Sequence, residues 1–205
     1  MSKIYLIRHG QTDWNLAGRI QGCQDIPLND TGKEQAALLA ERMKDCRVDL
    51  VLASPLSRAW ETARGLAVSK KIPLICWKEL EEIRYGSWEG MTVEEICRKY
   101  PEEYRRWWSD EGDGRPPHGE SRLEALERGR RMAQRIVKLV QSHRTEGLAV
   151  VSHGALLCCM LPAFLGEETV LSEGSSIRNG SVTTLEVDWK TGKCRLEEMN
   201  KTWKG

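Results

Sequence analysis

The chain has 205 residues, of which 40% are hydrophobic and 30% charged, and its formal net charge at neutral pH is +1. This near-zero charge gives no overall field that would favour nucleic acid or an anionic membrane, so we expect neither partner. The first residues lack the apolar core of a signal peptide, and no apolar run approaches the roughly 20 residues of a membrane-spanning helix. These features predict a cytoplasmic protein with a single domain over residues 1–205.

The first apolar run, residues 4–7, predicts a buried strand that ends in Arg8, His9 and Gly10. Arginine offers a planar fork of donors that suits phosphate, and histidine can act as a nucleophile or an acid near neutral pH. Glycine lets the backbone approach a bound group closely. We therefore expect an anion site at the carboxyl end of this strand.

Helices and strands then alternate. A loop rich in glycine and proline leads into a helix, a second buried strand, a further helix and a third short strand, at residues 32–46, 49–54, 59–68 and 72–77 respectively. This alternation predicts an α/β fold with a mainly parallel sheet. Arg58 would lie in the first turn of its helix, at the same sheet edge as His9.

Residues 79–119 interrupt this alternation and predict a lid. The segment holds three acidic candidates, Glu81, Glu82 and Glu89, and two predicted helices. A linker-like loop at residues 110–119 closes it. We expect its tryptophans to pack inside the lid rather than to form a stacking platform.

The second half of the chain holds another predicted apolar strand that ends in histidine and glycine. A long helix over residues 121–143 should turn its arginines to solvent: Arg128, Arg130, Arg131 and Arg135. The apolar strand after it ends in His153 and Gly154, where another helix follows. Alternating residues from 181 to 199 then predict a β-hairpin at the sheet edge, which could pair with a second copy as a homodimer.

Two arginines and two histidines thus meet at one sheet edge and form a cationic cup that suits phosphate: Arg8, His9, Arg58 and His153. The chain has no P-loop, no GxSxG elbow and no carboxylates spaced for two metals. Its seven cysteines form no CxxC pair and have no zinc spacing. Nucleophilic catalysis by histidine remains.

Five segments, taken in order, resemble the histidine phosphatase superfamily in its phosphoglycerate-mutase-like, small-phosphatase branch: LIRHGQTDWN, GRIQG, SPLSRAWETA, LEEIRYGSWEG and VVSHG. The resemblance covers nearly the whole chain. It implies a three-layer α/β/α sandwich with a mostly parallel central sheet and a helical lid insertion.

The resemblance also implies roles for single residues. His9 would accept the phosphoryl group, while Arg8, Arg58 and a cationic His153 would hold it. Asn15 and Gln21 would contribute to substrate binding, and Glu82 would donate the proton. The guanidinium groups beside His9 should disfavour its protonation, which keeps the nucleophile neutral.

The expected activity is that of a histidine acid-type phosphatase, a metal-independent phosphomonoester hydrolase that forms a phosphohistidine. Its substrate would be a small phosphorylated metabolite, and it would need no cofactor. A phosphoglycerate mutase is one alternative, because the family includes such enzymes. A non-catalytic regulatory domain that binds a phosphorylated ligand is the other.

Overall fold

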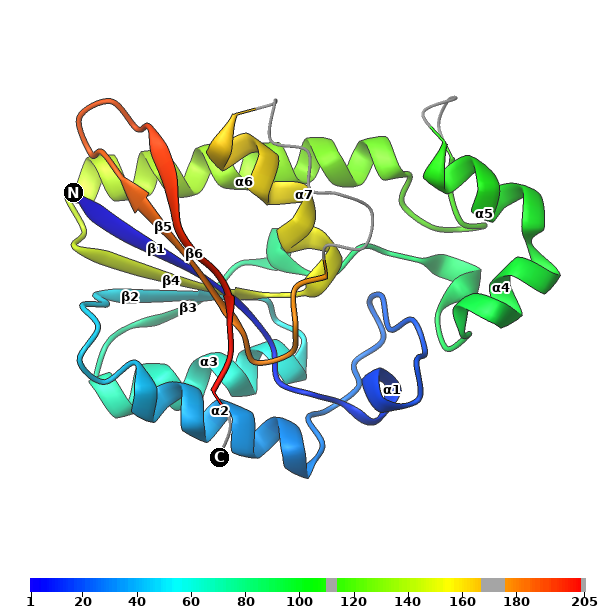
Figure 1. Ribbon diagram of the computed structural model, residues 1–205, viewed down its shortest axis with the longest axis horizontal. Coiled ribbons are helices and arrows are strands. Elements are labelled where there is room, and N and C mark those ends of the chain that lie inside the picture. Colours follow the sequence, from blue (N-terminus) through cyan, green and yellow to red (C-terminus); the bar gives the residue numbers. More distant parts are fainter. Residues whose placement is uncertain (110–113, 167–175, 204–205) are drawn as a thin grey trace.

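The computed structural model describes residues 1–109, 114–166 and 176–203. In these residues six strands form one sheet in the order β3-β2-β4-β1-β5-β6 (Figure 1). Strands β1 to β4 run parallel to one another, whereas β5 pairs antiparallel with β1 and β6 pairs antiparallel with β5. The predicted mixed α/β fold with a mostly parallel sheet is therefore confirmed.

The central strands are apolar along their length because both faces of the sheet are covered. Strand β1 (Ser2–Arg8) sends Ile4 and Leu6 to one face and Tyr5 and Ile7 to the other. The remaining strands are β2 (Leu50–Ala53), β3 (Leu74–Cys76), β4 (Gly147–Ser152), β5 (Val182–Val187) and β6 (Cys194–Lys201). The last two form the predicted hairpin.

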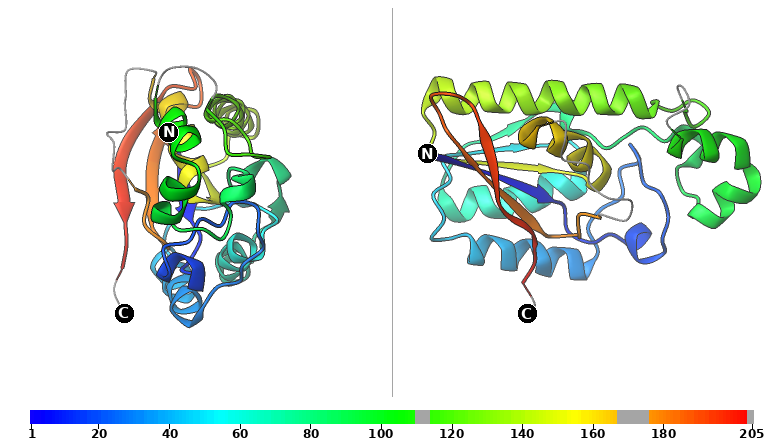
Figure 2. Two further views of the ribbon diagram at one scale, coloured as in Figure 1. Left: turned by 90° about the vertical axis from the view of Figure 1, so that its right-hand side faces the viewer. Right: turned by 45° about the horizontal axis from the view of Figure 1, so that its top comes forward.

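Helices cover the sheet in two layers (Figures 1 and 2). Helices α2 (Asp30–Arg42) and α3 (Ser57–Lys70) bury their apolar stripes against one face. Helices α6 (Arg122–His143) and α7 (Gly154–Leu165) cover the other. The three-layer sandwich is thus the observed architecture.

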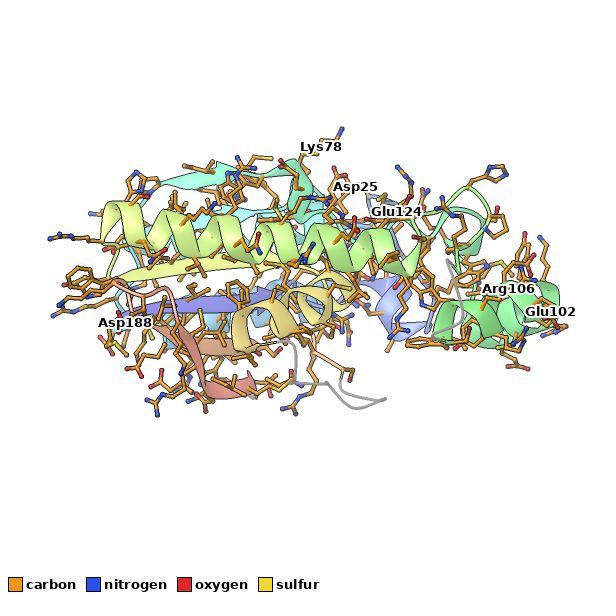
Figure 3. The ribbon with its side chains drawn as sticks, turned by 90° about the horizontal axis from the view of Figure 1, so that it is seen from above. Asp25, Lys78, Glu102, Arg106, Glu124 and Asp188 are labelled. Carbon is orange, nitrogen blue, oxygen red and sulfur yellow. The ribbon has the colours of Figure 1, made fainter. Side chains whose placement is uncertain are left out.

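The excursion after β3 has a small core of its own. It contains the 3₁₀ turns η1 (Lys78–Leu80) and η2 (Gly86–Trp88) and the helices α4 (Val93–Lys99) and α5 (Pro101–Trp108). Trp88 and Trp107 are buried there against Tyr85 and Tyr104. Figure 3 shows Glu102 and Arg106 of α5 at the far end of the molecule, while Lys78 lies beside α6. The prediction that the tryptophans pack inside the lid is confirmed for Trp88 and Trp107 but is wrong for Trp108, which is 53% exposed.

Some local predictions need correction. A short helix, α1 (Asp13–Leu16), which Thr12 and Asn15 cap, was not predicted. Residues 110–113 of the linker-like loop lie outside the described residues.

None of the seven cysteines forms a disulfide. Among the described helices, none combines the length and apolar character needed to cross a bilayer.

Candidate functional site

The parallel register brings the two histidines together. Arg8 pairs with Ser152 across β1 and β4, so the residues that follow them, His9 and His153, leave the sheet side by side. Their ring centroids lie 5.1 Å apart. Paired parallel strands run in the same direction, so their carboxyl ends lie at the same edge of the sheet. The predicted convergence of these two strand ends is therefore confirmed.

His9 is buried, with 2% of its surface exposed. Its Nδ1 lies 2.6 Å from the carbonyl oxygen of Gly10, which can only accept, so the ring proton sits on Nδ1. The Nε2 lone pair is therefore available as a nucleophile. Burial lowers the pKa of His9 well below its usual range, and the charges of Arg8 and Arg58 lower it further. The predicted neutral His9 is supported, although burial, the larger cause, was not foreseen.

The two guanidinium groups are held by backbone carbonyls. Arg8 donates from Nη1 to Ile177, 2.5 Å away. Arg58 is fully buried and donates to Gly22 at 2.8 Å and to Gln24 at 2.6 Å. Neutral carbonyls do not cancel these charges, so both arginines keep a positive charge for an incoming anion.

His153 differs from its prediction. Burial and the charge of Arg58 lower its pKa well below the usual range, so the expectation of a cationic His153 is wrong for the ligand-free site. Its Nε2 lies 2.8 Å from the hydroxyl of Ser54, which already accepts from the backbone N–H of Leu56. The hydroxyl can then donate to Nε2, which places the imidazole proton on Nδ1.

Glu82 lies at the N-terminus of α7, the helix that His153 precedes. Its carboxylate accepts from the backbone N–H groups of Leu156 at 3.0 Å and Ala155 at 3.2 Å. Burial lowers the pKa of both Arg8 and Arg58, and the charge of Glu82 is the largest influence that raises it. The structure therefore brings Glu82 to the same edge as the cup.

Two cavities flank this edge. One of about 610 Å³ is lined by Cys23, Glu82, Arg84 and Arg128 among others. The other, of about 410 Å³, is lined by Arg8 and by polar groups that include Gln11, Arg178 and Asn179. His9, Arg58 and His153 line neither cavity.

Asn15 and Gln21 reach the site in different ways. Gln21 is 7% exposed, and its buried Oε1 has no partner in the described residues. Asn15 accepts through Oδ1 from Thr12 and from Asn179, 3.0 Å away. Asn15 is thus tied to the chain that carries His9, whereas the Gln21 carboxamide has an unused acceptor.

Sequence reasoning missed Asn179. Its Nδ2 group lies 3.1 Å from the carbonyl oxygen of His9 and 3.3 Å from that of Gly10. Gly180 follows with φ of 65° and donates to the carbonyls of Arg8 and His9. Asn-Gly is a turn signal, and it was the available indication of this brace.

The role expected for Gly10 also needs correction. A Cβ at Gly10 would lie 2.4 Å from the carbonyl oxygen of Gly32. The missing side chain makes room for the start of α2 rather than for a bound group.

Glu89 ties the loop that holds Arg58 to the excursion. Its Oε1 accepts from the backbone N–H groups of Cys23 at 3.0 Å and of Tyr85 at 3.1 Å. Its Oε2 accepts from the side-chain amide of Gln24 at 2.8 Å. A Cβ at Gly22, where φ is 55°, would collide with this carboxylate. Glu89 therefore supports the carbonyls that hold Arg58.

Buried side-chain atoms without a partner gather at this edge. Four of the six in the described residues belong to predicted site residues: Arg8 Nε, Arg58 Nε, His153 Nδ1 and Gln21 Oε1. Buried polar atoms nearly always have partners, and three of these four are donors once the proton of His153 is on Nδ1. A tetrahedral oxyanion would satisfy all three. Across the described residues, no group of three or more His, Cys, Asp or Glu is arranged to hold a metal.

The chain is similar to known proteins over nearly its whole length. The profile described as histidine phosphatase superfamily (branch 1) matches residues 4–202. A phosphoserine phosphatase 1 of Hydrogenobacter thermophilus is 36% identical over 92% of this chain and 88% of its own length. A probable phosphoglycerate mutase of Escherichia fergusonii is 31% identical over 91% and 85%. The solved phosphoserine phosphatase of Entamoeba histolytica, in complex with 3-phosphoglyceric acid, superposes with a TM-score of 0.84 at 32% identity, covering 98% of each chain.

Proposed function

Because the chain belongs to the histidine phosphatase superfamily, we propose that it is a metal-independent phosphomonoester hydrolase that forms a phosphohistidine on His9. The observation that carries this proposal is the set of buried, unpartnered donors around His9: Arg8 Nε, Arg58 Nε and His153 Nδ1. Donors that are fixed before the substrate arrives stabilise the charge that develops on the equatorial oxygens of a transferring phosphoryl group.

In the first half-reaction Nε2 of His9 attacks phosphorus, and the bond between phosphorus and the ester oxygen breaks. Arg8, Arg58 and His153 hold the three equatorial oxygens. Glu82 gives its proton to the leaving oxygen, so the alcohol departs as a neutral molecule. The Nδ1 proton of His9 stays hydrogen-bonded to the Gly10 carbonyl oxygen. This bond stabilises the positive charge that the phosphorylated ring acquires.

In the second half-reaction water attacks the phosphohistidine. Glu82, now ionised, takes one proton from this water, while the bond between phosphorus and Nε2 breaks. Inorganic phosphate leaves, and both His9 and Glu82 return to their starting states. No electron transfer and no further reactant are required.

We infer that the substrate is a small organic phosphate. The relatives support both hydrolysis and isomerisation, since one is a phosphoserine phosphatase and another a probable phosphoglycerate mutase. We favour hydrolysis because identity is higher to the phosphatase.

Phosphate release from a panel of esters in excess EDTA tests this proposal. The panel contains p-nitrophenyl phosphate, phosphoserine, 3-phosphoglycerate, α-ribazole phosphate and sugar phosphates, and 2-phosphoglycerate formation is followed in parallel. Release should persist in EDTA and fall by at least about 10³-fold in His9→Ala, with an acid-labile phosphoryl adduct trapped in the wild type only. His143→Ala is the matched control, because that histidine is exposed on α6.

Three outcomes would contradict the proposal. Loss of activity in EDTA would indicate a metal-dependent reaction. Isomerisation of 3-phosphoglycerate without release would assign a mutase. Tight phosphate binding by wild type and His9→Ala, with no turnover by either, would assign the non-catalytic regulatory domain.

A further inference from the structure

The segment that carries Glu82 is fixed by an arginine on a neighbouring helix. Arg128 was expected on the solvent face of α6, but its side chain is only 16% exposed, so that expectation is wrong. It forms a two-pronged ion pair with Glu120, with both nitrogen–oxygen distances at 2.8 Å. Glu120 is itself 12% exposed and marks the entry to α6.

The remaining donors of Arg128 hold the backbone of the excursion. Nη1 lies 2.8 Å from the carbonyl oxygens of both Glu79 and Glu81, and Nη2 lies 3.4 Å from that of Glu82. Together with the two bonds to Glu120, these contacts account for all five N–H groups of the guanidinium. Arg128 therefore has no N–H group left to donate to a substrate, and its donors are all bonded to Glu120 and to the chain that carries Glu82.

The held segment, residues 79–82, is anchored by the fully buried Leu80, but its backbone carbonyls have side chains as their hydrogen-bond partners. Beyond the 3₁₀ turn η1 it belongs to no helix or strand, so the sheet ladder does not fix it. Its four successive carbonyls instead accept from side chains. The Ser152 hydroxyl donates to the carbonyl oxygen of Leu80 at 2.8 Å, and the Cys23 Sγ lies 3.6 Å from that of Glu82. Arg128 donates to the carbonyls of Glu79, Glu81 and Glu82. Among the described residues, only Arg128 bonds to three of the four.

The position of this backbone determines where the Glu82 carboxylate lies. The carboxylate must meet both the N-terminus of α7 and, in the proposed reaction, the leaving oxygen beside His9. A displacement of about 1 Å in a reacting group can cost 10²-fold in rate. We propose that Arg128 is the positioning residue for the proton donor Glu82, a role that rests on the proposed function.

A change of leaving group separates this role from a general structural one. p-Nitrophenolate departs without a proton, whereas the alcohol of glycerol 2-phosphate needs one, so only the second substrate needs the Glu82 proton in the transfer to His9. Because hydrolysis of the phosphohistidine is common to both substrates, the readout is kcat/KM, which reports the transfer step. In Arg128→Met, kcat/KM for glycerol 2-phosphate should fall by about 10- to 100-fold. For p-nitrophenyl phosphate, kcat/KM should stay within about threefold. Arg128→Lys should recover little, since one ammonium cannot replace five fixed donors.

Two other variants complete the experiment. Glu82→Gln shows how far the ratio of kcat/KM for glycerol 2-phosphate to kcat/KM for p-nitrophenyl phosphate falls when the proton donor is lost. Arg130→Met is the matched control, because Arg130 is exposed on the same helix and should leave both rates unchanged. If Arg128→Met does not fold, as judged by circular dichroism, Glu120→Gln removes the ion pair at constant size and should lower the same ratio less strongly.

The outcomes are distinguishable. An equal fall for both substrates, or an unchanged ratio in Arg128→Met alongside a lowered ratio in Glu82→Gln, would overturn the positioning role alone. An unchanged ratio in Glu82→Gln would overturn the assignment of the proton donor and the positioning role with it.

Discussion

The ring centroids of His9 and His153 lie 5.1 Å apart, and burial together with the charges of Arg8 and Arg58 lowers the pKa of both. Each histidine lies at the end of a parallel strand, and burial lowers the pKa of both well below the usual range. The ligand-free site therefore contains two neutral imidazoles beside two permanent cations. Two of the following predictions depend on this arrangement.

Acid should destabilise the folded protein through these histidines. Their folded-state pKa lies below the unfolded value of about 6.5, so the unfolded chain binds more protons as pH falls below that value. The stabilisation is fully present above pH ~6.5 and is lost toward the folded pKa, by up to about 1.4 kcal/mol per pH unit for each histidine. Urea unfolding of the wild type between pH 8 and 5 should show this slope.

His9→Asn should flatten that slope, because one of the two groups is removed. His143→Asn should retain it, since that histidine is exposed. The same slope in the wild type and His9→Asn would show that His9 is protonated as readily in the folded protein as in the unfolded chain.

Binding of an oxyanion should be coupled to proton uptake. A dianion beside His153 favours the imidazolium form and opposes the effect of burial and Arg58. Sulfate remains a dianion across this range, so its Kd should fall as the pH is lowered from 8 to 6. Calorimetry in two buffers of different ionisation enthalpy should report the uptake directly. His153→Asn should bind sulfate with little pH dependence, while His118→Asn should match the wild type; a pH-independent Kd in the wild type would contradict this prediction.

Gly10→Ala should destabilise the protein by about 1–3 kcal/mol, because the new methyl group meets the Gly32 backbone, which cannot move away as a side chain would. Gly65→Ala provides a control of opposite sign. On α3 its Cβ would make an ordinary 3.7 Å contact, and alanine in a helix is favoured by about 0.5–1 kcal/mol. The free energies of unfolding of both variants test this, and a neutral Gly10→Ala would show that the strand end and α2 can separate at little cost.

Glu89→Ala should weaken phosphate binding without removing a group that touches it. The variant frees the loop of residues 22–24, whose carbonyls hold Arg58. We expect KM and the inhibition constant of inorganic phosphate to rise about tenfold, equivalent to ~1.4 kcal/mol. Glu94→Ala is the comparison, since within the described part of the chain that side chain pairs only with Arg98, at 3.9 Å on the surface. Equal constants in the wild type and Glu89→Ala would show that Arg58 does not depend on this loop.

The parts of the site that sequence predicts are those that parallel strands dictate. His9 and His153 follow two apolar runs, and the common edge of a parallel sheet brings such residues together whatever lies between them. Arg58, at the start of the next helix, was predictable for the same reason. The layers were predictable too, since an uninterrupted apolar strand must be covered on both faces.

The remaining features depend on docking between distant segments, which periodicity does not encode. Arg128 occupies a helix position that would be solvated if the excursion did not lie against it. Glu89 looks like an ordinary surface glutamate until the loop of residues 22–24 folds beside it. The neutral state of His153 follows from complete burial, a property of the assembled layers rather than of its neighbours in sequence.

The strand order also determines when the site can form during synthesis. Strand β1 lies between β4 and β5, so Ile7 pairs with Val151 and Val182, both made much later. At roughly 5–20 residues per second, the first partner emerges about 7–30 s after β1. Until then an apolar strand has two unpaired edges in the nascent chain. In that interval Arg8 and His9 lack both His153 and Asn179 beside them, so the predicted anion site can assemble only in the last part of translation.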